Sequence, residues 1–366
     1  AEPYSTRRTN GATELRCGGM RAVVLHGVRD VAVEDVPDAG VPGPDGLLLR
    51  VEKTGICGSD LHPYHGVMAV PGIRLGHEFV GTVEDIGAEV RTVKKGDRIL
   101  VSGVIGCGVC GPCRAGDVVV CQNAGTKVFG VGLDLPGGQA EAVAVPAADG
   151  AVTKIPESIT TEQAVLLTDI LPTGYLGALR ADITPGDTVV VFGLGPVGVF
   201  ALQCAQLFGP ARILAVDRVG HRLARAAELG AEPIDATDGN AVAKIYEATG
   251  GRGAQAVIEA IGLEQTIFEA VMCAAPGATV SVVGVNMNFQ MPFPFPVALM
   301  KRLTFRVTLA SIPTTWEALF PLVASGRLKP EEVFTHKLGL SEAAEAYRIF
   351  DSRDDGCLKV LLDPTK

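Results

Sequence analysis

The chain has 366 residues, enough for about two domains, and its 47% hydrophobic content supports a large buried core. Its 41 acidic residues outnumber the 32 basic ones, which gives a formal net charge of −9 at pH 7. Because proteins that coat nucleic acid usually present a basic face, this charge argues against nucleic-acid binding. The 45 glycines, set against 5% aromatic residues, indicate many tight turns and close backbone approaches.

The first 19 residues contain no recognisable secretory signal. Arg7 and Arg8 are adjacent, but polar residues follow them where an export signal needs an apolar stretch. We interpret residues 1–19 as a flexible N-terminal extension and Met20 as the beginning of the first strand. The uncharged stretch 188–211 is long enough to span a bilayer, yet its glycine-rich centre favours a buried strand, a turn and a helix. We therefore expect a cytoplasmic protein that does not bind membranes.

The first half of the chain is predicted to be rich in β-structure. Residues 20–150 contain short apolar runs that are separated by Gly, Pro and Asp, a pattern typical of strands joined by long loops. Examples of these runs are residues 47–54, 79–86 and 98–102.

From about residue 161 the pattern changes to strands that alternate with helices. This alternation is typical of a parallel, doubly wound α/β sheet. Beyond residue 311 we expect two helices and a last strand that returns to the β-rich part. The predicted division is a β-rich domain at 20–174 and 311–366 and a cofactor domain at 175–310. Buried strands of the parallel sheet are expected at 188–192, 212–217, 256–259 and 279–283.

A G-x-G-x-x-G motif follows the predicted strand 188–192 directly and opens a helix. The first glycine permits a tight turn, the second allows the backbone to approach a pyrophosphate, and the third lets helix and strand pack closely. The helix N-terminus supplies a positive dipole. The predicted pyrophosphate-binding turn comprises Gly193, Gly195, Pro196, Val197 and Gly198.

Asp217 ends the next predicted strand, about 20 residues beyond the motif, where a carboxylate can accept hydrogen bonds from the adenosine ribose. An acid at this position repels a 2′-phosphate, so NAD is preferred over NADP. Arg218 favours the opposite choice, because an arginine there can pair with the additional phosphate. Further cofactor contacts are expected from Arg222, Val283 and Val285.

Four of the nine cysteines lie in one short segment with the spacing C-x2-C-x2-C-x7-C. The odd number of cysteines and the length of the chain argue against a disulfide framework. Four thiolates on one loop suit a closed, structural zinc site. The first three also match part of an iron–sulfur motif, but the fourth is too distant and is followed by Gln122 rather than proline. The predicted lobe, residues 107–121, contains Cys107, Cys110, Cys113 and Cys121.

Cys57 lies in the string GICGSDLH (55–62), and His77 lies in GHE (76–78). A thiolate and an imidazole are both zinc ligands, but two ligands do not complete a catalytic zinc site. Taken alone, these residues therefore leave the site undefined.

The motifs together resemble those of the zinc-containing medium-chain alcohol dehydrogenases. GICGSDLH, GHEFVG, the four-cysteine lobe and VFGLGPVG stand in the order typical of that family, and the resemblance covers the chain from Met20 to Pro364. TDILPTGY (168–175) and AVDRV (215–219) resemble the branch related to formaldehyde dehydrogenases. The resemblance implies a GroES-like, β-rich catalytic domain and a Rossmann cofactor domain.

The resemblance also implies a ligand set for the catalytic zinc: Cys57, His77 and Asp169. Asp169 stands where animal and yeast members often have a cysteine, and the charge is preserved because one thiolate and one carboxylate neutralise Zn²⁺. The alternative is that Asp169 only caps the helix that follows. Glu78 resembles the outer or exchanging carboxylate of the family, and Asp60 resembles the acid that orients the ligand histidine.

The remaining residues carried over from the family surround the substrate and cofactor. Ser59 and His62 match the proton relay that leads from the alcohol through the nicotinamide ribose to solvent. Thr173 matches the residue packed against the nicotinamide ring. Lys359 falls where the family places a basic residue near the pyrophosphate, and the alternative is a solvated lysine.

The implied activity is hydride transfer between an alcohol, or its aldehyde or ketone, and a nicotinamide cofactor, with one catalytic and one structural zinc per chain. The alternative within the family is a formaldehyde or aldehyde dehydrogenase or dismutase with tightly bound NAD. Metal-free reductases of the superfamily would lack Cys57, His77 and the cysteine lobe.

The motifs do not define the substrate, because specificity depends on loop side chains that line the cleft. Pocket candidates are Met68, residues 103–105 and Val285, and Gly103 suggests room for bulky or secondary alcohols. We also expect a homo-oligomer, dimer or tetramer, with a sheet edge near residues 280–285.

Overall fold

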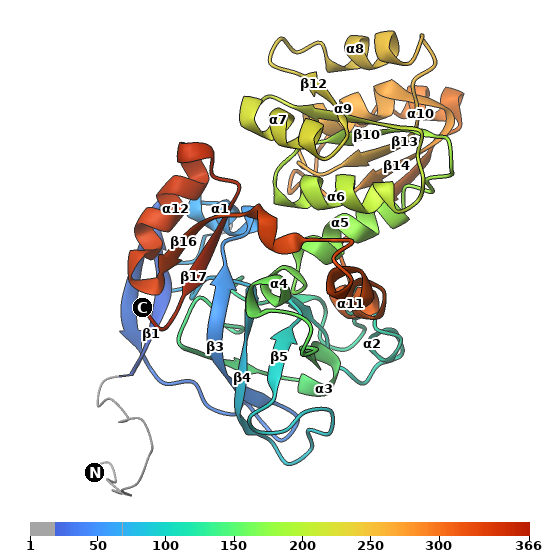
Figure 1. Ribbon diagram of the computed structural model, residues 1–366. Coiled ribbons are helices and arrows are strands. Elements are labelled where there is room, and N and C mark those ends of the chain that lie inside the picture. Colours follow the sequence, from blue (N-terminus) through green and yellow to red (C-terminus); the bar gives the residue numbers. More distant parts are fainter. Residues whose placement is uncertain (1–18, 68) are drawn as a thin grey trace, which may run out of the picture.

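The computed structural model describes residues 19–67 and 69–366. Residues 1–18 of the predicted extension and the pocket candidate Met68 lie outside the described residues. The chain forms a β-rich domain and a domain built on a parallel sheet, with helix α5 (Ile170–Leu179) at the junction (Figure 1). The predicted domain boundary at 174/175 falls inside this helix.

The β-rich domain contains a seven-stranded sheet and an N-terminal hairpin of β1 (Met20–Gly27) and β2 (Asp30–Val36). The last strand of the chain pairs antiparallel with β3, so both ends of the sequence contribute to this domain. In spatial order the sheet comprises β16 (Phe334–Gly339), β17 (Lys359–Asp363), β3 (Leu47–Gly55), β4 (Glu78–Ile86), β5 (Arg98–Val101) and β9 (Val152–Lys154), with β8 (Ala142–Val145) also paired to β3.

Short helices cover this sheet or connect its strands. Among them, η1 (Gly58–Asp60) and α1 (Leu61–Tyr64) follow β3, α4 (Thr161–Leu166) precedes α5, and α12 (Ala343–Ser352) precedes β17. The others are α3 (Ala148–Ala151), η3 (Ile312–Thr315), α11 (Trp316–Ala324), η4 (Pro330–Val333), η5 (Leu340–Glu342) and η6 (Asp354–Gly356).

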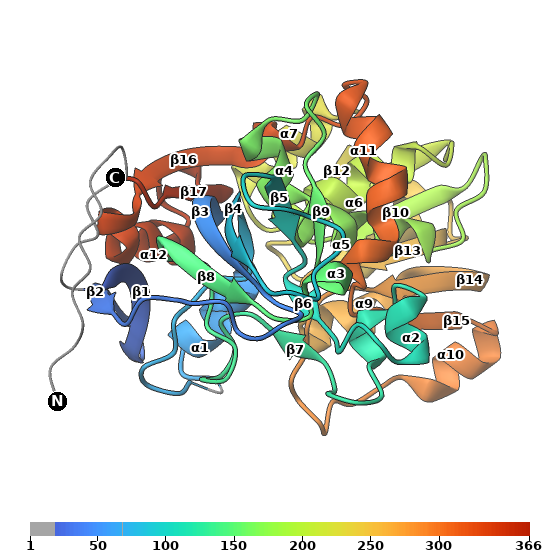
Figure 2. The same cartoon turned by 90° about the horizontal axis from the view of Figure 1, so that it is seen from below.

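The cysteine lobe is a small excursion from the β-rich domain. It contains α2 (Gly111–Arg114) and η2 (Val118–Val120) beside the two-stranded β6 (Val104–Ile105) and β7 (Lys127–Val128). Its α2 lies near α11 in both ribbon views (Figures 1 and 2). The backbone N–H of Val118 donates to Ser311 Oγ at 3.0 Å, which ties the lobe to the segment before η3.

The second domain is a six-stranded sheet whose neighbouring strands are all parallel. This order and direction confirm the predicted doubly wound α/β fold. In spatial order the strands are β12 (Glu232–Asp235), β11 (Arg212–Asp217), β10 (Thr188–Phe192), β13 (Ala254–Glu259), β14 (Ala274–Val282) and β15 (Thr304–Val307).

Side chains alternate between the two faces of this sheet, and helices cover both. Val189 and Val191 of β10 pack in the cluster that contains residues of α5, α6 (Pro196–Gln206) and α7 (Gly220–Glu228). Val190 and Phe192 pack on the opposite side, with α8 (Ala241–Ala248) and α9 (Glu264–Cys273). The uncharged stretch 188–211 is therefore a buried strand, turn and helix, as expected. Among the described residues, no helix is long and apolar enough to cross a membrane.

The exposed sheet edge differs from the expectation. Residues 280–282 belong to β14, which is paired on both sides, and β15 forms the edge. The sequence TFRV of β15 is short and includes a charged residue, so its pattern does not stand out as a strand. α10 (Phe295–Lys301) immediately precedes β15 in the chain.

The glycine-rich turn packs as closely as the motif predicts. Gly193 has a φ of +85°, which favours glycine, and a Cβ on Gly198 would overlap the carbonyl oxygen of Gly193. Because residue 198 has no side chain, α6 can begin directly against the end of β10.

We expect Gly198→Ala to reduce the free energy of unfolding by about 1–3 kcal/mol, because the added methyl group overpacks this turn. Gly220, the first residue of α7 after β11, has open space at its Cβ position and is a matched control. Gly220→Ala should leave stability unchanged or raise it slightly. Chemical denaturation of both variants measures the difference, and equal stabilities would contradict the close packing at Gly198.

Candidate active site

A cavity of about 770 Å³ lies between the two domains. The β-rich domain contributes Cys57, Ser59 and His77 to its lining, and the parallel-sheet domain contributes Gly193 and Asp217. The predicted zinc ligands and the predicted cofactor-binding residues therefore line the same cavity, from opposite domains.

Strand pairing explains why Cys57 and His77 meet. β3 ends at Gly55 and β4 begins at Glu78, and these two residues are partners in the antiparallel register. Cys57 follows the end of β3, and His77 immediately precedes β4. Asp169 reaches the same point from the residue before α5.

The donor atoms of these three residues converge. Asp169 Oδ2 lies 3.2 Å from His77 Nε2 and 3.5 Å from Cys57 Sγ. Tetrahedral zinc with normal bond lengths places an N and an O ligand about 3.4 Å apart, and an S and an O ligand about 3.6 Å apart. The donor set and its spacing therefore fit a zinc ion.

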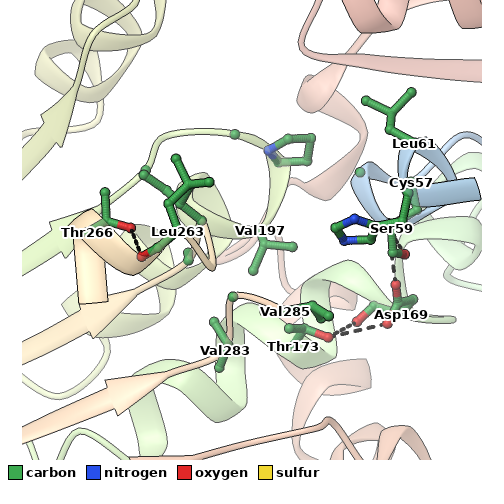
Figure 3. A pocket seen from close by; sticks show the side chains of 18 of the residues that line it. Cys57, Ser59, Leu61, Asp169, Thr173, Val197, Leu263, Thr266, Val283 and Val285 are labelled. Atoms are coloured by element: carbon green, nitrogen blue, oxygen red, sulfur yellow. Dashed lines mark hydrogen bonds between the residues drawn. The ribbon is translucent and has the colours of Figure 1, made fainter. Parts of the chain in front are cut away.

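The helix-cap interpretation of Asp169 is not supported by the geometry. Asp169 occupies the position before α5, but its side chain makes no capping hydrogen bond to the helix backbone. One carboxylate oxygen accepts from Thr173 Oγ1 at 3.3 Å, and the other faces His77 and Cys57. The carboxylate is therefore directed toward the other two donors, and Figure 3 shows Asp169 on the same side of the pocket as Cys57.

Polar groups behind the donors are arranged as the family resemblance implies, with one exception. Asp60 Oδ1 lies 3.1 Å from His77 Nδ1, where it can orient the ring. The carboxylate of Glu78 lies within 4.8 Å of the other donor atoms. Burial, and then the charge of Glu78, raises the pKa of the Cys57 thiol, and a bound dication would offset both effects.

The exception is Lys359, which the structure does not place near the pyrophosphate turn. Its side chain is 0% exposed, and its Nζ donates to Glu78 Oε1 at 2.7 Å. Gly55 leaves room for this ion pair, because a Cβ there would meet both side chains. A lysine within the apolar string CLKVLL was a signal for a buried partner rather than for solvent or cofactor.

The predicted relay residues lie on the same wall. Ser59 Oγ is 3.3 Å from Cys57 Sγ and 3.2 Å from His77 Nε2, next to the point where the donors converge. His62 on α1 also lines the cavity. Burial, and then the nearby His65, lowers the pKa of His62, so the imidazole is neutral at pH 7 and can accept a proton.

Asp217 lies beside the glycine-rich turn at the other end of the cavity. It is 9% exposed, its Oδ2 accepts from the backbone N–H of Leu194 at 2.7 Å, and its Oδ1 accepts from those of Arg218 and Val219. Arg222 Nη1 lies 3.8 Å from Asp217 Oδ2. The turn, the acid and both arginines therefore surround one part of the cavity, as predicted.

The middle of the cavity is apolar. Thr173 lies next to Asp169 with Val285 beside it in this view, and Val197 and Val283 lie farther from Cys57 and Ser59 (Figure 3). The loop after β13 and the first turn of α9 also line the cavity through Ala260, Ile261, Leu263, Gln265 and Thr266, as does Arg353 after α12. Sequence reasoning missed both, although a loop at the carboxyl end of a strand is the expected place for ligand contacts.

Gly103 does not provide room for substrate. A Cβ at Gly103 would lie 2.8 Å from the backbone oxygen of His77, so this glycine lets the chain pass directly behind His77. Its neighbour Val104 lines the cavity, and so does Val285. The sequence argument for bulky alcohols from Gly103 is therefore wrong.

The four cysteines of the lobe form a second cluster, with thiol sulfurs within 4.8 Å of one another. Tetrahedral zinc spaces its sulfur ligands about 3.8 Å apart, so the cluster fits this metal. The backbone N–H of Ala124 lowers the pKa of Cys121 to about 6, whereas burial and the Cys110 thiol raise that of Cys113 to about 12. A cation is needed to hold all four as thiolates. Four protein donors would fill all positions of a tetrahedral ion, which is typical of a structural site.

Comparison with known proteins agrees with this geometry. The family described as alcohol dehydrogenase GroES-like domain matches residues 43–157, and the family described as zinc-binding dehydrogenase matches residues 196–325. A probable zinc-binding alcohol dehydrogenase of Mycobacterium tuberculosis is 48% identical over 346 residues, which cover 94% of this chain and 89% of that protein.

The chain is also similar to a fungal protein and to a solved structure. Zinc-type alcohol dehydrogenase B of Aspergillus flavus is 36% identical, over 91% of this chain and 79% of its own. The structure of alcohol dehydrogenase TADH from Thermus sp. ATN1 is 42% identical, with a TM-score of 0.88 over 94% of this chain and 99% of that one. The chain therefore belongs to the zinc-type medium-chain alcohol dehydrogenase family, and its activity is zinc-dependent oxidoreduction of alcohols with a nicotinamide cofactor.

Proposed function

We propose that Cys57, His77 and Asp169 hold the catalytic zinc and that the enzyme prefers NAD. The observation that carries this proposal is the convergence of a thiol, an imidazole and a carboxylate on one point of the cavity that also contains the dinucleotide turn. A second zinc is assigned to Cys107, Cys110, Cys113 and Cys121, which gives one catalytic and one structural ion per chain.

The protein groups have distinct roles in the reaction. Bound zinc supplies Lewis acidity, which lowers the pKa of a substrate hydroxyl, and the nicotinamide ring accepts the hydride. Ser59 would accept the hydroxyl proton while its own proton passes to the nicotinamide ribose, and neutral His62 would accept the proton that the ribose hydroxyl gives up at the end of the relay. Asp60 keeps His77 oriented, and Glu78 and Lys359 form a buried ion pair behind the donors.

The cofactor is proposed to lie along the opposite wall. Gly193, Gly195, Pro196 and Val197 line the cavity where the pyrophosphate meets the N-terminus of α6, with Gly198 packed beneath them. Asp217 faces the adenosine ribose, with Arg218 and Arg222 beside it, and Thr173, Val283 and Val285 contact the nicotinamide. A 2′-phosphate would bring negative charge against the nearly buried Asp217, which supports NAD.

The wall near the zinc donors supports an uncharged, largely apolar substrate. The β-rich domain contributes mostly aliphatic side chains there, and a charged substrate group would find no counter-charge on these described aliphatic residues. We therefore propose an apolar alcohol and the corresponding aldehyde or ketone as substrates. The aliphatic residues of this wall are Leu61, Val67, Val104, Val128 and Val131.

An aldehyde dehydrogenase or dismutase with tightly bound NAD is the alternative, and it rests on the segment TDILPTGY. Such an enzyme would retain its cofactor through purification.

The edge strand β15 and the exposed side chains Phe295, Leu299 and Met300 of α10 support a homo-oligomer, a dimer or tetramer. The domain limits 20–174 with 311–366, and 175–310, and a cytoplasmic location stay predictions.

Asp169→Ala should remove zinc from the catalytic site only. Activity should fall by several orders of magnitude, because Lewis-acid polarisation is the largest electrostatic contribution to the reaction. NAD binding should persist, since the glycine-rich turn is in the other domain. Zinc content, steady-state turnover of an alcohol with NAD, and cofactor fluorescence measure the three effects.

Ser59→Ala is the matched comparison on the same wall. It should retain both zinc ions and NAD binding, while turnover falls by about 10²–10⁴-fold, the usual range for a lost acid–base group. If Asp169→Ala instead kept two zinc ions and near-normal turnover, the ligand assignment would be wrong, and Glu78 would be the next candidate.

Asp217→Ser should narrow the preference for NAD over NADP, because it removes the negative charge that opposes the 2′-phosphate and leaves Arg218 free to pair with it. The ratio of kcat/KM for the two cofactors is the appropriate measurement, since losses common to both cofactors cancel. A wild-type enzyme that favours NADP would refute the assignment and show that Arg218 dominates this end of the cavity.

Cys110→Ser should lower the zinc content from two per chain toward one and reduce thermal stability without changing cofactor preference. Cys204, a buried thiol of α6 outside both clusters, is the control, and Cys204→Ser should keep two zinc ions. Metal analysis and thermal denaturation of both variants provide the comparison. Unchanged zinc content in Cys110→Ser would contradict the structural site.

A further inference from the structure

Gln139 is a fully buried polar residue at the point where the segments that carry Cys57 and His77 meet. Its side chain is 0% exposed, and its Nε2 donates to the backbone oxygen of Gly55 at 3.1 Å and to Asp60 Oδ2 at 3.4 Å. Gly76, with a φ of +96°, precedes His77, and a Cβ there would overlap the Gln139 side chain. One amide group thus contacts the ends of both ligand segments.

Tyr347 completes this arrangement from a distant part of the chain. It lies on α12, is 0% exposed, and donates its hydroxyl hydrogen to Gln139 Oε1 at 2.9 Å. The orientation of the amide is determined by its neighbours, because both Gly55 O and Asp60 Oδ2 are acceptors and need the NH₂ side. The Tyr347 hydroxyl then provides a hydrogen bond to the remaining polar atom of the Gln139 side chain, Oε1.

Asp60 connects the Gln139 amide to the two proposed ligands Cys57 and His77. Its Oδ2 accepts from the backbone N–H of Cys57 at 2.9 Å as well as from Gln139, and its Oδ1 faces His77 Nδ1 at 3.1 Å. With Oδ2 held by two donors, Oδ1 stays directed at the imidazole, whose Nε2 then points toward Asp169. Outer partners of this kind commonly change metal affinity by 10–100-fold.

We propose that Gln139 and Tyr347 are positioning residues for the catalytic metal: the phenol fixes the amide, the amide fixes Asp60, and Asp60 fixes the His77 imidazole. This inference rests on the proposed function, in which Cys57, His77 and Asp169 bind the metal. It assigns a role at the active site to a helix in the last part of the chain, which contributes no metal donor.

The test measures how readily the purified holoenzyme loses each zinc to a chelator. Tyr347→Phe deletes only the hydroxyl, and Gln139→Glu keeps the shape while replacing the NH₂ donor by an oxygen that faces Asp60. We expect both variants to release one zinc at a chelator concentration 10–100-fold lower than the wild type requires. The zinc of the cysteine lobe and the affinity for NAD should not change.

Tyr64→Phe is the matched control. Tyr64 belongs to the same buried cluster, and its ring centroid lies 5.3 Å from that of Tyr347. If Tyr347→Phe and Gln139→Glu lowered thermal stability but released zinc like the wild type and Tyr64→Phe, the two residues would serve packing alone, and the proposal would be overturned.

The visible spectrum of the Co²⁺-substituted enzyme provides a second readout, because it reports the geometry of the ligands. We expect the catalytic-site bands to shift in Tyr347→Phe and to stay unchanged in Tyr64→Phe, and identical spectra would count against the proposal. A wild-type enzyme that binds only the cysteine-lobe zinc would overturn the proposed function itself, and this inference with it.

Discussion

The antiparallel pairing of β3 with β4 sets the distance between Cys57 and His77, and the rest of the site depends on it. Gly55 and Glu78 are the last partners of this pairing, so the chain leaves the sheet for Cys57 beside the point where it enters after His77. A shift of register by one residue would turn His77 to the other face of the sheet. Asp169 has only to approach this fixed pair from the beginning of α5.

Buried charge accompanies these donors and ties distant segments to them. The Glu78–Lys359 pair is 0% exposed at both side chains, so it joins the first residue of β4 to the first residue of β17. Taking two such charges out of water is costly, and removing one partner leaves the other uncompensated. The return of the last strand to the β-rich domain thus contributes directly to the electrostatics behind the metal donors, as α12 does through Tyr347.

Local motifs were the part of the molecule that the sequence could predict. The glycine-rich turn, Asp217 and the four cysteines each depend on short spacings, and the structure places them as expected. The contacts that could not be predicted join residues that are far apart in the chain. Lys359 meets a residue 281 positions away, and Tyr347 meets Gln139 across 208 positions, so no local pattern reveals either pair. Gly103 was misjudged because its neighbour, the backbone of His77, is visible only in three dimensions.

In the proposed active site, a thiol, an imidazole and a carboxylate from three segments hold one metal ion. Diffraction from crystals of the wild-type enzyme, with data collected above and below the zinc absorption edge, tests it most directly. We expect two anomalous peaks per chain, one among Cys107, Cys110, Cys113 and Cys121 and one bounded by Cys57, His77 and Asp169. A peak at the cysteine lobe alone, or a second peak that Asp169 does not contact, would contradict it.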